Sequence, residues 1–161
     1  MESGYDEEEI RNEEDVETVA LAKARMIRHS FSGDLILGAD TAVFCEGDAL
    51  GKPRDKKEAA EMLARLSGQV HTVVTGVALI NGTKEITERE ITKVWMRRLD
   101  EEEIEAYVMS GDPMDKAGAY GIQGKAAVFV EKIEGCYFNV VGMPLTRVAA
   151  MLQAEGFSIW R

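Results

Sequence analysis

The sequence predicts an α/β fold in which helices flank a single mixed, twisted sheet. Its 161 residues are the size of one domain. Segments with helical periodicity alternate with β-prone runs, and no linker, repeat or low-complexity segment interrupts them. Three polar segments that contain glycine lie between these elements, which indicates a central cleft that they share. We therefore expect one domain over residues 1–161, with its functional groups in loops at the edge of the sheet.

The first expected elements are a helix and two strand segments around Asp40. Asn12 can cap a helix in which apolar residues recur at helical spacing. Residues 35–37 form a short apolar run typical of a buried strand, and residues 42–50 are typical of a hairpin that turns at residues 46–47. Asp40 is therefore expected in a loop, where the first strand ends.

The middle of the chain predicts two more helices on either side of a long hairpin. Each helix begins with an acid that can cap its first turn and a glutamate three residues later: Asp55 with Glu58, and Asp100 with Glu103. Between them, residues 70–80 and 84–97 are β-prone runs joined through Asn81 and Gly82, a strong hairpin signal.

The C-terminal part is expected to hold a polar loop, two strands and a helix. Residues 112–125 form the loop, which is rich in glycine. Residues 126–130 and 136–141 are both β-prone and predict strands. A last helix with apolar residues at helical spacing should run between Pro144 and Gly156.

Charge and cysteine content exclude several classes of function. The net charge is −10, but the first twenty residues hold nine acids against one arginine and carry most of it. An anionic ligand is thus compatible with the rest of the chain, whereas a nucleic-acid surface would need a basic stripe that the sequence lacks. The two cysteines form no metal or disulfide motif. No apolar run approaches the roughly 20 residues that span a membrane. We expect a soluble, cytoplasmic protein.

Several polar residues could carry chemistry, and each has a plainer alternative. Asp40 could orient or deprotonate a water, or simply form a turn. Lys52 precedes a proline that holds it extended, so its ammonium could project into a cleft instead of remaining an ordinary surface lysine. Asp115 and Lys116 could bind a ligand or form a surface ion pair of little consequence. The amide of Gln123 offers a donor and an acceptor that match the edge of a uracil or thymine ring.

Five segments of the chain, taken together, resemble the Maf family of nucleotide pyrophosphatases. They are Gly-Ala-Asp-Thr at 38–41, Leu-Gly-Lys-Pro at 50–53, Leu-Ser-Gly at 66–68, Asp-Lys-Ala-Gly-Ala-Tyr-Gly-Ile-Gln-Gly at 115–124, and Asn-Val-Val-Gly-Met-Pro-Leu at 139–145. The resemblance extends from about Tyr5 to the last helix and implies a Maf/ITPase-like fold. Members of that family open with a strand, a Ser-x-Ser-Pro-Arg-Arg loop and a helix, and this sequence begins downstream of them.

The resemblance also implies an activity and a set of roles. The expected reaction is metal-dependent hydrolysis of dTTP or UTP, or of modified pyrimidine nucleotides, to the monophosphate and pyrophosphate. The expected cofactor is a divalent cation, Mg²⁺ or Mn²⁺. The implied roles are catalysis for Asp40 and Lys52, base selection for Thr41 and Gln123, phosphate or substrate binding for Lys52, Asp115 and Lys116, and metal binding for Asp40 and Glu7, the latter with Asp6.

One rival function and one structural question stay open at this stage. The absent arginine-containing loop motivates the rival, a catalytically impaired nucleotide-binding or regulatory module. The sequence leaves open whether the chain forms a homodimer.

His71 has no partner at metal-ligand spacing, and Tyr120 and Asn139 are expected to be structural or to lie at the rim of the site.

Overall fold

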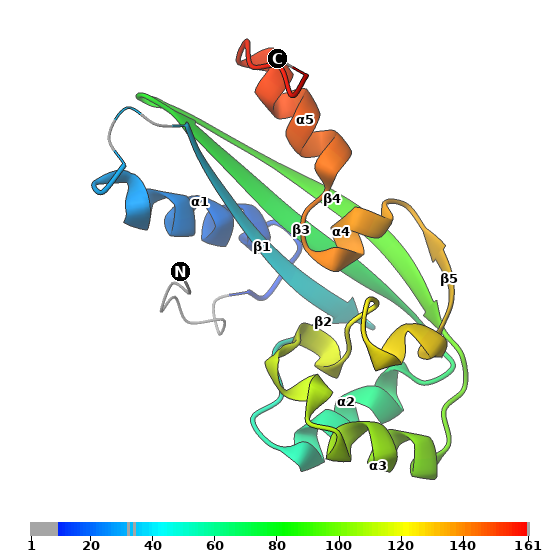
Figure 1. Ribbon diagram of the computed structural model, residues 1–161. Helices are drawn as coiled ribbons and strands as arrows, with labels where there is room; N and C mark the ends of the chain where they lie inside the picture. The colour runs from blue at the N-terminus through cyan, green and yellow to red at the C-terminus, as the bar shows by residue number, and fades with distance from the viewer. Residues whose placement is uncertain (1–9, 32, 34, 161) are drawn as a thin grey trace.

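The computed structural model describes residues 10–160 except 32 and 34 (Figure 1). Its centre is a five-stranded sheet in the order β2-β1-β3-β4-β5, in which every described pair of neighbours is antiparallel. The strands are β1 (Leu35–Cys45), β2 (Asp48–Leu50), β3 (Val70–Asn81), β4 (Lys84–Met96) and β5 (Val130–Glu134). Helices flank this sheet, so the predicted α/β class is confirmed.

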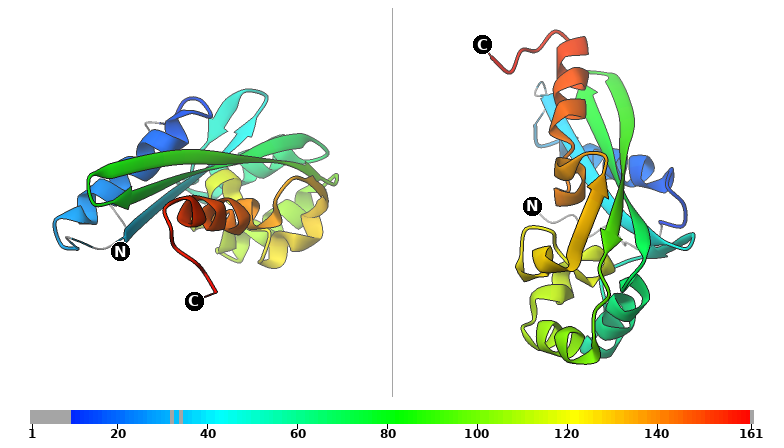
Figure 2. Two further views of the ribbon diagram at one scale, coloured as in Figure 1. Left: turned by 90° about the horizontal axis from the view of Figure 1, so that it is seen from above. Right: turned by 90° about the vertical axis from the view of Figure 1, so that its right-hand side faces the viewer.

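Helices cover both faces of the sheet and one of its ends. Helix α1 packs on one face, and α4 and α5 lie on the other, as the view from above shows (Figure 2). Helices α2 and α3 close the lower end together with three short 3-10 turns (Figure 1). The bounds are α1 (Asp15–Arg28), α2 (Lys56–Leu66), α3 (Glu101–Met109), α4 (Tyr137–Val141), α5 (Leu145–Ala154), η2 (Asp112–Asp115), η3 (Ala117–Ala119) and η4 (Lys125–Phe129). No helix in the described part is both long and apolar enough to cross a membrane.

Most of the locally encoded elements lie where the sequence predicts them. The α3 helix has both halves of its capping box, with Asp100 accepting from the Glu103 amide and Glu103 accepting from the Asp100 amide. The β1-β2 hairpin turns at residues 46–47, where both φ angles are positive. The β3-β4 register pairs Asn81 with Lys84, so the turn lies one residue later than predicted.

Strand β1 corrects the expectation that Asp40 lies in a loop. The strand runs without a break from Leu35 to Cys45, with Asp40 in its middle. Glycine and aspartate have low β propensity, which is why residues 38–40 suggested a strand end. The pairing of β1 with β3 continues through ten consecutive residues, from Leu35 to Phe44, and this ladder outweighs the local preference.

Two predicted strands near the C-terminus were wrong. Residues 126–130 fall mostly in the 3-10 turn η4, where Ala126 and Phe129 are buried three residues apart and Val128 is exposed. The segment predicted as a second strand, 136–141, instead forms helix α4. There the side chain of Asn139 donates to the backbone carbonyl of Val73, a tertiary bond that a local pattern does not reveal.

Two glycines let α1 lie directly on the strands. A Cβ at Gly38 would come within 2.4 Å of the Ala20 carbonyl oxygen, and one at Gly76 within 2.3 Å of the Val16 carbonyl oxygen. Helix backbone therefore meets strand backbone, with Gly76 directly opposite Asp40 in the register. This contact fixes the height of α1 above the sheet.

We expect Gly76→Ala to destabilise the fold by about 2–4 kcal/mol, because the new methyl group meets backbone atoms that cannot rotate away. Gly51→Ala is the matched control, since nothing lies within 4 Å of a Cβ at Gly51. Urea unfolding of the three proteins measures the effect. Equal stability of the Gly76 variant and the parent would contradict the close packing of α1.

Candidate functional site

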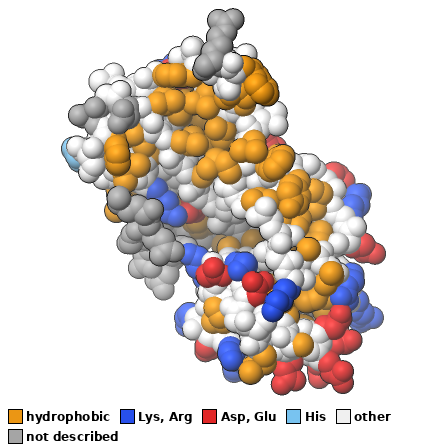
Figure 3. Space-filling view, viewed as in Figure 1, with side chains coloured by type: hydrophobic (Ala, Val, Ile, Leu, Met, Phe, Trp, Pro, Cys, Tyr) orange, Lys and Arg blue, Asp and Glu red, His pale blue; other side chains and the backbone are white. Residues whose placement is uncertain are grey.

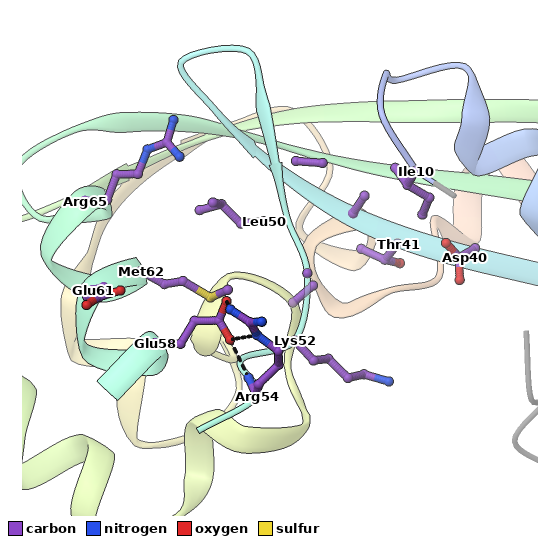
Figure 4. A pocket seen from close by; sticks show the side chains of 14 residues that line it. Ile10, Asp40, Thr41, Leu50, Lys52, Arg54, Glu58, Glu61, Met62 and Arg65 are labelled. Atoms are coloured by element: carbon purple, nitrogen blue, oxygen red, sulfur yellow. Dashed lines mark hydrogen bonds and ion pairs between the residues drawn. The ribbon is translucent and has the colours of Figure 1, made fainter. Parts of the chain in front are cut away.

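Two adjoining cavities form a cleft between the sheet and the helical end. They enclose about 630 Å³ and about 380 Å³. Asp40, Thr41 and Lys52 line both cavities. Figure 4 shows the larger cavity, with Lys52 extending from the loop that follows β2 on the side where Asp40 lies. In the space-filling view, charged side chains gather along the hollow below the largely hydrophobic upper part (Figure 3).

The cleft bends around the outer edge of β1. Asp40 and Thr41 are adjacent on the strand, so their side chains point to opposite faces of the sheet. Both nevertheless line both cavities. This is geometrically consistent because β2 pairs with β1 only from Val43 onward, and no other described strand lies beside residues 35–42 on that side. The cleft can therefore reach both faces.

Asp40 forms an ion pair with Lys23 of α1. The Asp40 side chain is only 6% exposed, whereas that of Lys23 is 25% exposed and lines the smaller cavity. A carboxylate this buried needs a charged partner to offset its loss of hydration. Sequence reasoning missed Lys23. Its position beside Ala20 and Ala24, on the buried face of α1, was the available signal.

Lys52 and the glycine-rich loop are held together by a backbone bond. The amide of Gly118 donates to the carbonyl of Gly51 at 3.0 Å, which brings the segment before Lys52 against residues 117–119. Pro53 is buried, while Lys52 is exposed and lines both cavities. The predicted location of Lys52 in a cleft is thus what the structure shows, although its role stays a prediction.

Of the paired residues Asp115 and Lys116, only Lys116 lines the cleft. Lys116 lines the smaller cavity, and its ammonium donates to the Asp115 carboxylate at 2.7 Å and to the Asp112 carbonyl at 2.6 Å. Its hydrogen bond with Asp115 raises the pKa of Lys116 and lowers that of Asp115. Asp115 itself is 81% exposed at its side chain and lines neither cavity. Its carboxylate acts on the cleft from outside, through the ion pair with Lys116 and through the charge of Lys52, which also lowers the pKa of Asp115.

Gln123, in the glycine-rich loop, lines the smaller cavity. It is exposed and shares that cavity with Asp40, Thr41 and Lys52. Gly121, two residues before it, is crowded by Lys116, whose Cε would lie 2.8 Å from a Cβ there. The structure therefore brings six polar residues together around one cavity: Lys23, Asp40, Thr41, Lys52, Lys116 and Gln123.

A buried pair anchors the same loop to the sheet. The Nε2 atom of His71 on β3 lies 2.6 Å from the hydroxyl of Tyr120, and the rings meet edge to face. Both side chains are buried. Burial lowers the pKa of His71 to about 4 and raises the pKa of Tyr120 above its ordinary range. Tyr120 lines the smaller cavity, so this pair holds one of its walls.

The charges of the smaller cavity suit an anion more than a cation. Among its described lining residues are three lysines and a single carboxylate, that of Asp40. No group of three or more histidine, cysteine or acidic side chains in the described residues could hold a metal ion alone. The predicted ligand Glu7, with Asp6, lies outside the described residues.

Comparisons with known proteins agree with the five sequence segments. A family model described as Maf-like protein matches residues 1–155. The dTTP/UTP pyrophosphatase of Symbiobacterium thermophilum is 51% identical over 145 residues, which cover 90% of this chain and 75% of that protein. The dTTP/UTP pyrophosphatases of Moorella thermoacetica and Methanosarcina barkeri are 52% and 50% identical, over 90% and 86% of this chain and 76% and 71% of theirs.

We expect the free energy of unfolding to fall as the pH is lowered from about 6.5 to about 4, by up to about 3 kcal/mol from His71 alone. The folded state keeps His71 neutral down to about pH 4, whereas the unfolded chain binds the proton near pH 6.5. The contribution of His71 to the free energy of unfolding is therefore fully present above that pH range and is lost on acidification through it.

Urea unfolding of the parent and of His71→Gln at several pH values checks this, because carboxylates titrate alike in both proteins. The stability difference between the two should be constant above pH 6.5 and shrink below it. A difference that does not change with pH would show that His71 is not buried as a neutral group.

Proposed function

The chain belongs to the Maf family, and we propose that it hydrolyses a pyrimidine nucleoside triphosphate, dTTP or UTP, to the nucleoside monophosphate and pyrophosphate. The observation that carries the proposal is the cleft around β1. One cavity there combines a buried carboxylate, three lysines and a polar amide, which are the parts that cleavage of a nucleotide anhydride requires. The names of the relatives supply the substrate class.

The lysines account for binding of the triphosphate. Lys23 and Lys52 come from different elements, α1 and the loop after β2, and both line the smaller cavity beside Asp40. A triphosphate carries several negative charges, and preorganised cations stabilise the further charge that develops on the leaving pyrophosphate. The charge of Lys23 is partly offset by its ion pair with Asp40, and that of Lys116 by its ion pair with Asp115.

Asp40 is the proposed general base. In the reaction a water oxygen forms a bond to the α-phosphorus, the bond from that phosphorus to the α–β bridging oxygen breaks, and pyrophosphate leaves. Asp40 accepts the proton of the attacking water. The ion pair with Lys23 offsets the charge of the carboxylate and holds it in one orientation, and the middle of a strand fixes its backbone.

A divalent cation fits this site only with help from the substrate. Asp40 is the described carboxylate that reaches the centre of the cleft, and Mg²⁺ commonly takes one or two carboxylates together with substrate phosphates. Such an ion would neutralise charge on the triphosphate when bound. The proposed dependence on Mg²⁺ or Mn²⁺ therefore rests on Asp40 and the phosphates.

A cytoplasmic location is also proposed, supported by two cysteines that form no disulfide.

The base is proposed to lie between β1 and the glycine-rich loop. Thr41, on β1, and Gln123, in the glycine-rich loop, both line the smaller cavity, and Gly142 adds no side chain beside Thr41. An amide and a hydroxyl that face one ring can reject bases whose donors and acceptors are placed differently. This arrangement gives the site its selectivity for pyrimidines.

We expect Asp40→Asn to lower kcat for UTP and dTTP at least 100-fold, because it removes the base while keeping the shape of the side chain. Asp48→Asn is the control, since Asp48 is an exposed acid on β2 that lines neither cavity. Release of pyrophosphate from each nucleotide is the measurement. More than about a tenth of the parent kcat in the Asp40 variant would exclude its role as base. No pyrophosphate release by the parent would refute the proposed function itself.

Gln123→Ala should flatten the preference among nucleotides, because it removes the amide that a mismatched base would leave unpaired. The control is Gln153→Ala, which truncates an exposed glutamine on α5. Steady-state rates with dTTP, UTP, CTP and dGTP decide the outcome. An unchanged ranking of the four nucleotides in the Gln123 variant would remove this residue from the base site.

A further inference from the structure

The hydroxyl of Thr41 ends a chain of hydrogen bonds that starts in the buried part of the protein. Thr41 on β1 lies directly opposite Thr75 on β3, and their hydroxyl oxygens are 2.9 Å apart. The Thr75 hydroxyl also lies 3.0 Å from the backbone carbonyl oxygen of Asn139 in α4. Thr75 and Asn139 are both fully buried, whereas Thr41 lines the cleft.

The chemistry of these groups fixes which atom donates in each bond. A carbonyl oxygen can only accept, so the single hydroxyl proton of Thr75 goes to Asn139. The oxygen of Thr75 then has only lone pairs to offer Thr41, and Thr41 must donate its own proton to Thr75. The oxygen of Thr41 is left with lone pairs alone on its cleft side.

The carbonyl that sets this direction is held firmly in place. The Asn139 side chain donates to the Val73 carbonyl at 3.0 Å and to the Thr92 hydroxyl at 2.9 Å. That hydroxyl in turn donates to the carbonyl of Cys136 and accepts from its amide, both at 3.0 Å. Helix α4 is thus tied to two strands, and its backbone cannot turn away from Thr75.

A glycine, Gly142, lies beside the Thr41 hydroxyl oxygen and adds no side chain there. Gly142 has a φ of +112°, and a Cβ there would lie 3.5 Å from the Thr41 hydroxyl oxygen. Gly142, Thr41 and Gln123 line the same cavity. A ligand that enters between them meets a hydrogen-bond acceptor with no room taken by a side chain at residue 142.

We propose that Thr75, with the Asn139 carbonyl, makes Thr41 an obligate acceptor that selects bases carrying a ring N–H. Uracil and thymine present an N–H at ring position 3, whereas cytosine presents a lone pair there, which would face the lone pairs of Thr41. The inference rests on the proposed function and adds the physical basis of its choice of pyrimidine. Thr75 is in this view a positioning residue, because it touches Thr41 and not the nucleotide.

The test compares Thr75→Val with Thr75→Ser by the ratio of kcat/KM for UTP to that for CTP. Valine keeps the shape but removes the oxygen, so Thr41 is free to rotate and donate to cytosine, and the ratio should fall at least 10-fold. Serine keeps the hydroxyl and should keep the parent ratio within about 3-fold. If Thr75 had a purely structural role, Thr75→Val would lower kcat/KM for UTP and CTP by the same factor. An unchanged ratio would therefore overturn the proposal.

A second pair of variants keeps the test decisive if Thr75→Val does not fold. Thr41→Val removes the acceptor and should lower the UTP preference at least 10-fold, and Thr41→Ser should retain it. An unchanged preference in Thr41→Val refutes the proposal. If the parent releases pyrophosphate from no nucleotide, the proposed function fails separately. Calorimetric binding of the α,β-imido analogues of UTP and CTP to the same variants then decides the selectivity claim.

Discussion

The contact between the α1 backbone and the two glycines of the sheet determines where the site can form. Gly38 lies two residues before Asp40 on the same face of β1, and Gly76 lies opposite Asp40 on β3. Because neither has a side chain, α1 settles low enough for Lys23 to reach the Asp40 carboxylate. The buried charge is thereby stabilised, since a carboxylate left unpaired at this depth would cost several kcal/mol.

The outer edge of β1 gives the cleft its two chemical sides. Alternation along the strand sends Asp40 toward α1 and Thr41 toward α4, and the cleft bends around the edge to meet both. The proposed cleavage chemistry therefore lies on the α1 side. Recognition of the base lies on the α4 side, where the hydroxyl chain through Thr75 ends at the cleft.

The sequence predicted what local interactions decide and missed what distant contacts decide. The caps of α2 and α3 and the turn of the β1-β2 hairpin depend on residues three or four apart, so the local sequence predicted them. Asp40 was expected in a loop because its neighbours disfavour strands, yet pairing with β3 holds it in one. Lys23 escaped notice because its partner is seventeen residues away on another element. Most candidate residues of the cleft were recognised from their residue type and local sequence, and the family resemblance supplied their roles.

The central claim is that one cleft around the edge of β1 holds the whole nucleotide, with the base and the triphosphate on different sides of the strand. A crystal structure of the Asp40→Asn variant with the α,β-imido analogue of UTP tests it most directly. We expect the uracil ring between Thr41 and Gln123, and the α-phosphate between residue 40 and Lys52. A nucleotide with its phosphates at Gln123, or one bound outside both cavities, would contradict it.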